Sequence, residues 1–263
     1  MDLTHAKRIG LGRTAEVYAW DDGRVLKLFH AWAAPAWVEH ERGVTAAAHA
    51  AGLPAPAVFG PEVVGDRHGF VLERVEGPSQ LQALQARPWR VVAVGRQLAE
   101  VHAALHARTV PGLRPLREKL REDITRAELP GPLEARAQAA LARMPDGDAV
   151  CHGDLHPDNV VLTGRGPVVL DWSEAAAGHP LADVARSSLM LRIAGHPQGS
   201  LGPLLLAGRR LLHAAYLRRY LALTGGRREA LAPFLLPVAA ARASHRIEDE
   251  RPALLAWIAR LAG

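Results

Sequence analysis

The sequence has very little cysteine, few aromatic residues and no long apolar run. Cys151 is the single cysteine among 263 residues, so an internal disulfide is excluded and a reducing compartment is expected. No stretch approaches the ~18 uninterrupted apolar residues that a membrane helix needs. The first ten residues also lack the apolar core of a signal peptide. We therefore expect a cytoplasmic protein that has no membrane partner.

Internal repeats and low-complexity linkers are also missing. The net charge is +5 and the isoelectric point is about 10, but the arginines occur singly or in pairs along the chain. Such scattered arginines are typical of a solvated surface, so no nucleic-acid partner is expected. With 49% hydrophobic residues, the chain can bury a substantial core in one large domain or two modest lobes.

The first part of the chain is predicted to form a small, mostly antiparallel sheet with one helix. Alternating apolar residues predict strands over 7–11, 15–20 and 24–29, with a turn at 21–23. A helix is expected over 34–51, ended by Gly52 and the Pro54-x-Pro56 break. Two further strands are expected over 57–64 and 69–74.

The pattern changes after Glu76-Gly77-Pro78 and becomes mostly helical. Helical spacing covers 81–107 and 115–144, short strands are expected at 149–151, 160–162 and 168–170, and helices resume from Leu181. These elements indicate an α+β fold with two lobes. We expect an N-terminal lobe at 1–76, a hinge near 73–78, and a C-terminal lobe at 77–263 with a loop region at 151–171 and a helical region at 181–263.

The most informative segment is His-Gly-Asp-Leu-His-Pro-Asp-Asn at 152–159, followed by two short strands and Asp171. Two strands joined by a turn would bring Asn159 and Asp171 to one end of the pair. Phosphoryl transfer needs a carboxylate to orient the acceptor hydroxyl and take its proton, and oxygen ligands to hold Mg²⁺ against the phosphates. Asp154 is the candidate base, with Asn159 and Asp171 as candidate metal ligands. Each residue alone would fit an ordinary turn, but the joint pattern does not.

This segment resembles the signature H-G-D-[LIF]-H-x-x-N of the aminoglycoside phosphotransferases and of related choline, homoserine and other small-molecule kinases. The resemblance implies a bilobal, protein-kinase-like fold, ATP or GTP as donor, and Asp154, Asn159 and Asp171 in the roles given above. It leaves two roles open for His156, which lies near the transferred phosphate or braces the loop. The family-like stretch at 178–183 suggests that Asp183 caps a helix and ties down the loop.

In the N-terminal lobe, Gly10 and Gly12 lie between two predicted strands and would let backbone N–H groups approach a phosphate. Lys27, on the predicted strand 24–29, would contact the α- and β-phosphates. Its partner should be a glutamate of the following helix. Glu39 and Glu41 are two apart and cannot share a face, and the spacing of Glu41 to Pro54 favours Glu41.

Residues 70–77 resemble the connection between the lobes of these kinases, whose backbone would bind adenine, with Glu73 and Val75 as the candidate contacts. The segment at 98–105 resembles a family helix in which His102 is interpreted as a packed core residue. Only eleven residues separate Asp171 from Asp183, too few for the long activation segment of a protein kinase.

The acceptor is expected to be a small molecule with a hydroxyl group. Residues 186–263 contain twelve arginines and four acidic residues, an unusual balance for a lobe that binds a polycation such as an aminoglycoside. The acidic cluster at 248–250 either supplies a local cation-binding patch or forms a solvated helix face. A neutral, weakly cationic or anionic acceptor fits better. Choline, thiamine, sugar or homoserine kinases, and a non-catalytic nucleotide-binding relative, are the alternatives; the chain is expected to be a monomer or homodimer.

Overall fold

The computed structural model describes residues 6–193 and 202–263, and its contacts divide the chain into two compact units. The first unit contains the residues up to Gln80 together with Asp158–Glu174. The second contains Leu81–Pro157 and Ala175–Gly263. The segment 158–174 therefore packs with the N-terminal residues, whereas the sequence reading groups it with the C-terminal lobe. The functional division into lobes near residue 76 stays a prediction.

The first unit is built on a five-stranded antiparallel sheet with the strand order β1-β2-β3-β5-β4. Tight turns join neighbouring strands, and Gly23 (φ +89°) and Gly65 (φ +62°) take left-handed conformations in two of these turns. The strands are β1 (Arg8–Leu11), β2 (Ala15–Asp21), β3 (Arg24–Phe29), β4 (Val58–Val64) and β5 (Arg67–Glu73).

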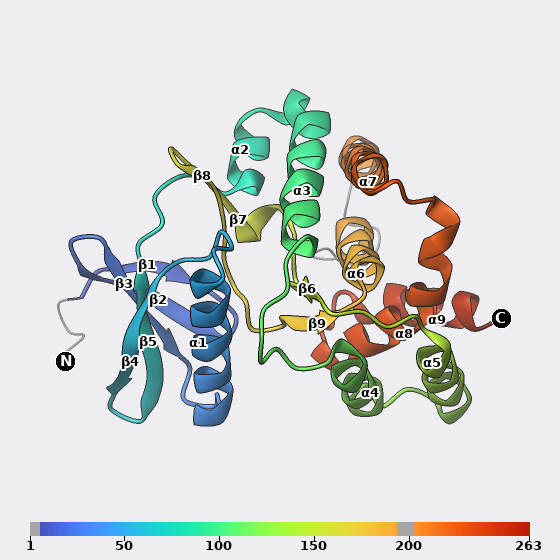
Figure 1. Cartoon of the computed structure of the whole chain (residues 1–263), viewed down its shortest axis with the longest axis horizontal. Helices are drawn as coiled ribbons and strands as arrows, with labels where there is room; N and C mark the ends of the chain where they lie inside the picture. The colour runs from blue at the N-terminus through green and yellow to red at the C-terminus, as the bar shows by residue number, and fades with distance from the viewer. Residues whose placement is uncertain (1–5, 194–201) are drawn as a thin grey trace. The chain divides into compact units, whose positions relative to one another are not determined.

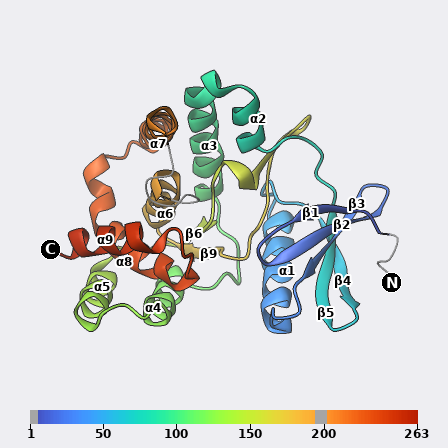
Figure 2. The same ribbon diagram turned by 180° about the vertical axis from the view of Figure 1, so that it is seen from behind.

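Helix α1 (Pro35–Ala50) lies along one face of this sheet (Figures 1 and 2). Proline at its first position suits the helix start, where an N–H has no partner to lose. Phe29 and Phe70 of the sheet pack with Val38 of α1 in a buried apolar cluster. Side chains alternate across a strand, so Lys27 of β3 shares this α1-facing side with Phe29.

A hairpin of β7 (Val160–Thr163) and β8 (Gly166–Val169) completes the first unit, with Val160 opposite Val169. The segment just before the second unit pairs with it, because the N–H of Leu162 donates to the carbonyl of Pro78 at 2.9 Å. Gly77 (φ +142°) is required at this approach, since a Cβ there would lie 2.1 Å from the carbonyl oxygen of Leu162.

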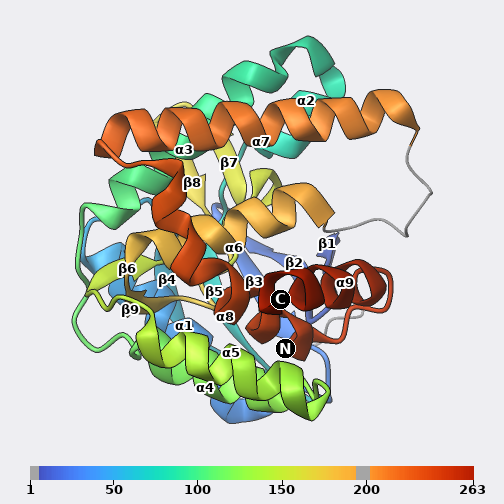
Figure 3. The ribbon, with the colours of Figure 1, turned by 90° about the vertical axis from the view of Figure 1, so that its right-hand side faces the viewer.

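The second unit consists mostly of helices, and α3 lies beside α7 while α4 lies beside α5 (Figure 3). Its large buried side chains include Tyr216, Tyr220 and Phe234. Two short strands, β6 (Ala149–Cys151) and β9 (Ala176–Gly178), form an antiparallel pair. The helices are α2 (Gln80–Ala86), α3 (Val91–His106), α4 (Leu116–Arg126), α5 (Gly131–Arg143), α6 (Pro180–Ile193), α7 (Pro203–Thr224), α8 (Ala232–Arg242) and α9 (Arg251–Ala262).

The predicted fold class is confirmed: a small antiparallel sheet with one helix precedes a mostly helical part. The expected helical stretches 81–107 and 115–144 are each split into two helices, because Pro88 and Pro130 cannot continue a helix that began before them. Strand β9 was not expected from the sequence. Within the part of the chain that the structure describes, no helix is long and apolar enough to cross a membrane.

The packing of α3 against α7 predicts opposite effects for two helical glycines. A Cβ at Gly95 of α3 would lie 2.7 Å from the carbonyl of Leu212, whereas a Cβ at the exposed Gly43 of α1 would meet nothing within 4 Å. Gly95→Ala should therefore lower the free energy of unfolding by about 1–3 kcal/mol through overpacking. Gly43→Ala should raise it by roughly 0.5–1 kcal/mol through helix propensity. Urea denaturation measures both, and shifts of the same sign would contradict the packing.

Candidate active site

In the first unit, three charged side chains from distant parts of the sequence meet on the α1-facing side of β3. The ammonium of Lys27 pairs with the carboxylate of Glu41, and its Nζ lies 3.6 Å from Oδ1 of Asp171. Burial would lower the pKa of Lys27, but the charges of Asp171 and Glu41 outweigh it and raise that pKa. Lys27 is therefore charged at neutral pH. Glu39 instead pairs with Arg42.

Asp171 is held in an unusual backbone conformation at the end of the β7–β8 hairpin. Its φ is +61°, in the left-handed region, and its Oδ1 accepts a hydrogen bond of 2.9 Å from Oγ of Ser173. The preceding residue, Leu170, donates its N–H to the carbonyl of Asn159 at 2.8 Å. Asn159 and Asp171 thus lie at the same end of the hairpin, where their oxygens offer the donor type that Mg²⁺ prefers.

Gly10 and Gly12, the candidate phosphate contacts of the first unit, lie on β1 and in the turn that follows it. Gly12 closes the turn between β1 and β2 by donating its N–H to the carbonyl of Ala15 at 2.8 Å. Gly10 lies on β1, where a Cβ would be 3.3 Å from Cβ of Val17, so the strand and turn leave little room for larger residues. Both glycines have ordinary negative-φ or extended backbones, so their role in this turn is steric.

The two candidate residues of the connecting segment differ in what their side chains do. The carboxylate of Glu73, the last residue of β5, accepts the N–H of Ala57 at 3.2 Å and pairs with Arg165 at 2.5 Å. The N–H of Glu73 also donates to the carbonyl of Ala57 at 2.9 Å, so its side chain and its N–H are both used within the fold. Val75 follows it in the segment that leads to Gly77 and the hairpin, and its side chain is half-buried.

In the second unit, Asp154 lies in the loop that follows β6. Gly153 turns the chain with a φ of +79°, and the N–H of Asp154 then donates to Nδ1 of His152 at 3.2 Å. Nε2 of His156 lies 3.6 Å from Oδ2 of Asp154. The loop thus places a histidine beside the candidate base, and its next carbonyl, that of Leu155, accepts a 2.8 Å hydrogen bond from Ser187.

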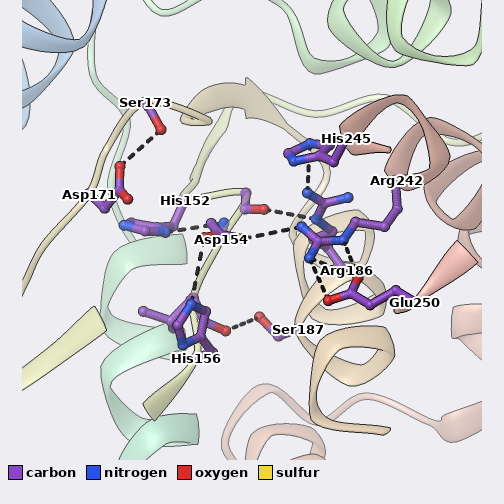
Figure 4. A network of polar contacts seen from close by, with 12 residues as sticks. His152, Asp154, His156, Asp171, Ser173, Arg186, Ser187, Arg242, His245 and Glu250 are labelled. Carbon is purple, nitrogen blue, oxygen red and sulfur yellow. Dashed lines mark hydrogen bonds and ion pairs between the residues drawn. The ribbon is translucent and has the colours of Figure 1, made fainter. Parts of the chain in front are cut away.

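Two buried arginines flank Asp154 (Figure 4). Nη1 of Arg242 lies 3.7 Å from Oδ1 of Asp154, and Nε of Arg186 donates to the carbonyl of Gly153 at 3.1 Å. Burial would raise the pKa of Asp154, but His156, Arg186 and Arg242 outweigh it and hold that pKa below its ordinary value. The carboxylate is therefore ionised at neutral pH, as an acceptor of a proton must be.

Within the acidic cluster at 248–250, Glu250 fits neither expectation, a cation-binding patch or a solvated helix face. Its side chain is buried and accepts hydrogen bonds of 3.0 to 3.2 Å from Nε and Nη2 of Arg242. Glu248 and Asp249 are exposed. The pair with Arg242 was not predictable, because a break between α8 and α9 brings together residues eight positions apart.

Asp183 connects the loop 152–159 to helix α6. Its Oδ1 accepts the N–H of Gly153 at 2.9 Å, and its Oδ2 accepts the N–H of His152. The expected tie between Asp183 and the loop is therefore present, but the helix-capping interpretation is wrong. Helix α6 begins at Pro180, so Asp183 lies inside its first turn and its carboxylate is directed to the loop.

Two histidines of α3 converge on the same carboxylate. Nε2 of His102 lies 3.0 Å and Nε2 of His106 lies 3.4 Å from Oδ2 of Asp183. The Nδ1 atoms lie 2.7 Å from the hydroxyls of Tyr216 and Tyr220, respectively. His102 is a packed core residue, as expected. His106 and both tyrosines were missed, although a signal exists: each pair is four residues apart, which places its members on one helix face.

Comparisons with known proteins identify a family and a fold. The profile of the family described as "Phosphotransferase enzyme family" matches residues 5–234. A search of curated proteins gives no match.

Several solved structures share the fold. The aminoglycoside phosphotransferase APH(4)-Ia, crystallised with AMP-PNP and hygromycin B, has a TM-score of 0.67 and 17% sequence identity. The match covers 98% of this chain and 93% of APH(4)-Ia. A choline/ethanolamine kinase family protein from Mesorhizobium loti has a TM-score of 0.58 and 18% sequence identity. The match covers 97% of this chain and 86% of the M. loti protein. The amicoumacin kinase hAmiN, in complex with AMP-PNP, Ca²⁺ and Ami, has a TM-score of 0.60 and 14% sequence identity. The match covers 98% of this chain and 87% of hAmiN.

The buried histidine pair predicts how stability depends on pH. Burial and the charge of His102 lower the pKa of His106 to about 4, against 6.5 for an unperturbed histidine. Between these values the unfolded chain binds a proton that the folded chain does not, so the free energy of unfolding should fall as pH drops from 6.5 towards 4, by up to about 3 kcal/mol.

His106→Gln should therefore flatten the curve of unfolding free energy against pH in this window. Urea denaturation at several pH values measures it, with His40→Gln, which changes an exposed histidine, as the matched control. Equal slopes for the wild type and His106→Gln would contradict the assignment.

Proposed function

Because the chain belongs to the phosphotransferase enzyme family, we propose that it transfers the γ-phosphate of ATP to a hydroxyl group of a small molecule. The meeting of Lys27, Glu41 and Asp171 carries the proposal, since this lysine–glutamate pair and metal-binding aspartate are the parts that kinase-type transfer requires. Solved structures of the same fold were determined with AMP-PNP, which supports ATP as donor; GTP is the alternative.

On the nucleotide side, Lys27 would hold the α- and β-phosphates, with Glu41 fixing the position of its ammonium. The backbone around Gly10 and Gly12 would lie over the phosphates, where small residues let N–H groups come close. The backbone of Glu73 and Val75 would bind adenine, with the carbonyl of Glu73 as the contact, since its N–H and its carboxylate are already used by Ala57 and Arg165.

Asn159 and Asp171 would hold Mg²⁺. Both offer oxygen atoms, the ligands of hard cations, and the hairpin brings them to one end. When bound, Mg²⁺ neutralises charge on the phosphates during transfer. The hydrogen bond from Ser173 to Asp171 would orient the carboxylate so that its second oxygen remains directed to the ion.

On the acceptor side, Asp154 would accept the hydroxyl proton as the oxygen attacks phosphorus. Arg242, Arg186 and His156 keep its carboxylate ionised and limit its movement. His156 either contacts the transferred phosphate or braces the loop; its 3.6 Å approach to Asp154 supports the bracing role. Transfer would be direct, without a phosphoenzyme.

We propose an acceptor that is neutral, weakly cationic or anionic, and not a polycation. His156 and Arg242 lie within 3.7 Å of the carboxylate of Asp154, Arg186 adds a further positive charge, and the carboxylate of Glu250 is bound to Arg242. A polycation such as an aminoglycoside would meet like charge here. A metabolite kinase for choline, thiamine, a sugar or homoserine is therefore the second candidate, and the likeness to a choline/ethanolamine kinase family protein is consistent with it.

The proposal also assigns a role to each part of the chain. Residues 1–76 would form the nucleotide-binding lobe with a hinge at 73–78, and the helical region 181–263 would bind the acceptor. The protein would act in the cytoplasm as a monomer or homodimer.

Substitution of the two aspartates separates the two halves of the mechanism. Asp154→Ala should lower turnover by about 10²–10⁴-fold or more, because the proton acceptor is lost, while Mg²⁺-dependent ATP binding stays near normal. Asp171→Ala should lose metal-dependent ATP binding as well. A coupled ADP-release assay and ATP titrations with and without Mg²⁺ measure these effects. Near-normal turnover of Asp154→Ala would show that the base is assigned wrongly.

The choice of acceptor is tested by an ADP-release screen over aminoglycosides, amino alcohols, vitamins, sugars and hydroxy amino acids. We expect acceptors with at most one positive charge to be phosphorylated with the highest kcat/KM. Rapid phosphorylation of aminoglycosides would contradict the acceptor class while leaving the proposed chemistry intact.

A further inference from the structure

The second unit contains a pocket that lies apart from the catalytic loop. It is lined by α6, α7, α8, α9 and the 3₁₀ helix Arg228–Leu231, which can be followed in Figure 3. The pocket is small, with a free volume of about 90 Å³, and it opens to solvent. The apolar part of its wall consists of Leu189, Leu217, Leu231, Leu235, Val238 and Trp257.

Two polar atoms in the wall are buried without a hydrogen-bond partner. Ser188 is 7% exposed, and neither its Oγ nor Nε2 of His213 has a partner among residues 6–193 and 202–263. Buried groups of this kind are rare in native proteins, because each loses its bonds to water and gains nothing in return. Both residues line the pocket, so a polar atom of a ligand placed there would satisfy them.

The pocket also carries positive charge that no carboxylate balances. The guanidinium of Arg192 lies over the ring of Trp257, 4.2 Å from its centre, and Arg228 lines the same pocket. Both arginines are exposed, and neither forms an ion pair with an acidic residue of the described chain. Burial, and then Arg192 and Arg228, lower the pKa of His213 to about 4, which reflects the same unbalanced charge.

The pocket is separate from the proposed active site, although both use helix α6. Asp183, Arg186 and Ser187 contact the catalytic loop. The residues of α6 that line the pocket are Ala185, Ser188, Leu189 and Arg192, three or four apart, which form a different stripe of the helix. No residue of the loop 151–159 lines the pocket.

We propose that this pocket binds a small organic anion that carries an oxyanion group, a carboxylate or a phosphate monoester, on an apolar body. The oxyanion lies between Arg192 and Arg228, where guanidinium groups give charge-assisted hydrogen bonds. Ser188 and His213 contact the same group and so gain partners. The apolar body packs on the leucines and on Trp257. This site is independent of the phosphotransfer reaction.

The test is isothermal titration of the full-length protein with two anions, hexanoate and phenyl phosphate. Hexanol, hexylammonium and inorganic phosphate serve as probes that lack the negative charge or the apolar body. We expect saturable one-to-one binding of at least one of the two anions and clearly weaker binding of all three controls. Arg228→Gln should weaken binding of that anion about tenfold, as loss of one charge-assisted contact implies.

Two further variants distinguish a loss of anion binding from a loss of folding. Arg218→Gln removes the same charge from an exposed position of α7 outside the pocket and should leave binding unchanged. Ser188→Ala should raise the melting temperature of the free protein, because it removes an unsatisfied buried group, while weakening anion binding. The proposal is overturned if neither anion binds saturably, if a control probe binds as tightly, or if Arg218→Gln weakens binding as much as Arg228→Gln.

Discussion

The second unit depends on the buried carboxylate of Asp183. A charge without water is stable only when donors surround it, and here they come from two places: backbone amides of the catalytic loop and the histidines at 102 and 106 of α3. Those histidines contact the hydroxyls of two tyrosines of α7. The loop conformation, the position of α6 and the packing of α3 on α7 therefore depend on one another. Loss of this carboxylate would leave the loop amides without partners in a buried site, and Asp154 would lose its support.

The first unit uses the same principle for its own chemistry. Lys27, Glu41 and Asp171 are buried or half-buried charges that satisfy one another, and the left-handed backbone of Asp171 is held by the β7–β8 hairpin. Both units therefore hold the groups of the proposed chemistry through charges that are balanced inside the protein. The pocket between α6 and α9 differs. Its exposed arginines have no acidic partner within the described chain, and neither Oγ of the buried Ser188 nor Nε2 of the half-buried His213 has a hydrogen-bond partner there.

Local patterns predicted much of the fold, and long-range partners explain what they missed. Strand β3 and strand β6 have the predicted bounds, because apolar alternation and flanking turns define them without reference to the rest of the chain. The motif at 152–159 and Asp171 likewise identified the residues of the proposed chemistry. The four-residue spacing of His102 and His106 indicates a shared helix face. Their partner Asp183, like strand β9 and the Arg242–Glu250 pair, depends on segments that meet only after folding, so no local pattern specifies it.

The central claim is that phosphate passes directly from the nucleotide to the acceptor oxygen, with Asp154 as the base. The most direct test is the stereochemical course at phosphorus, measured with ATP whose γ-phosphate is made chiral with oxygen isotopes and with an acceptor that the screen identifies. A single in-line displacement inverts the configuration, and inversion is the predicted result. Retention would require two displacements through a phosphorylated enzyme group and would contradict the account.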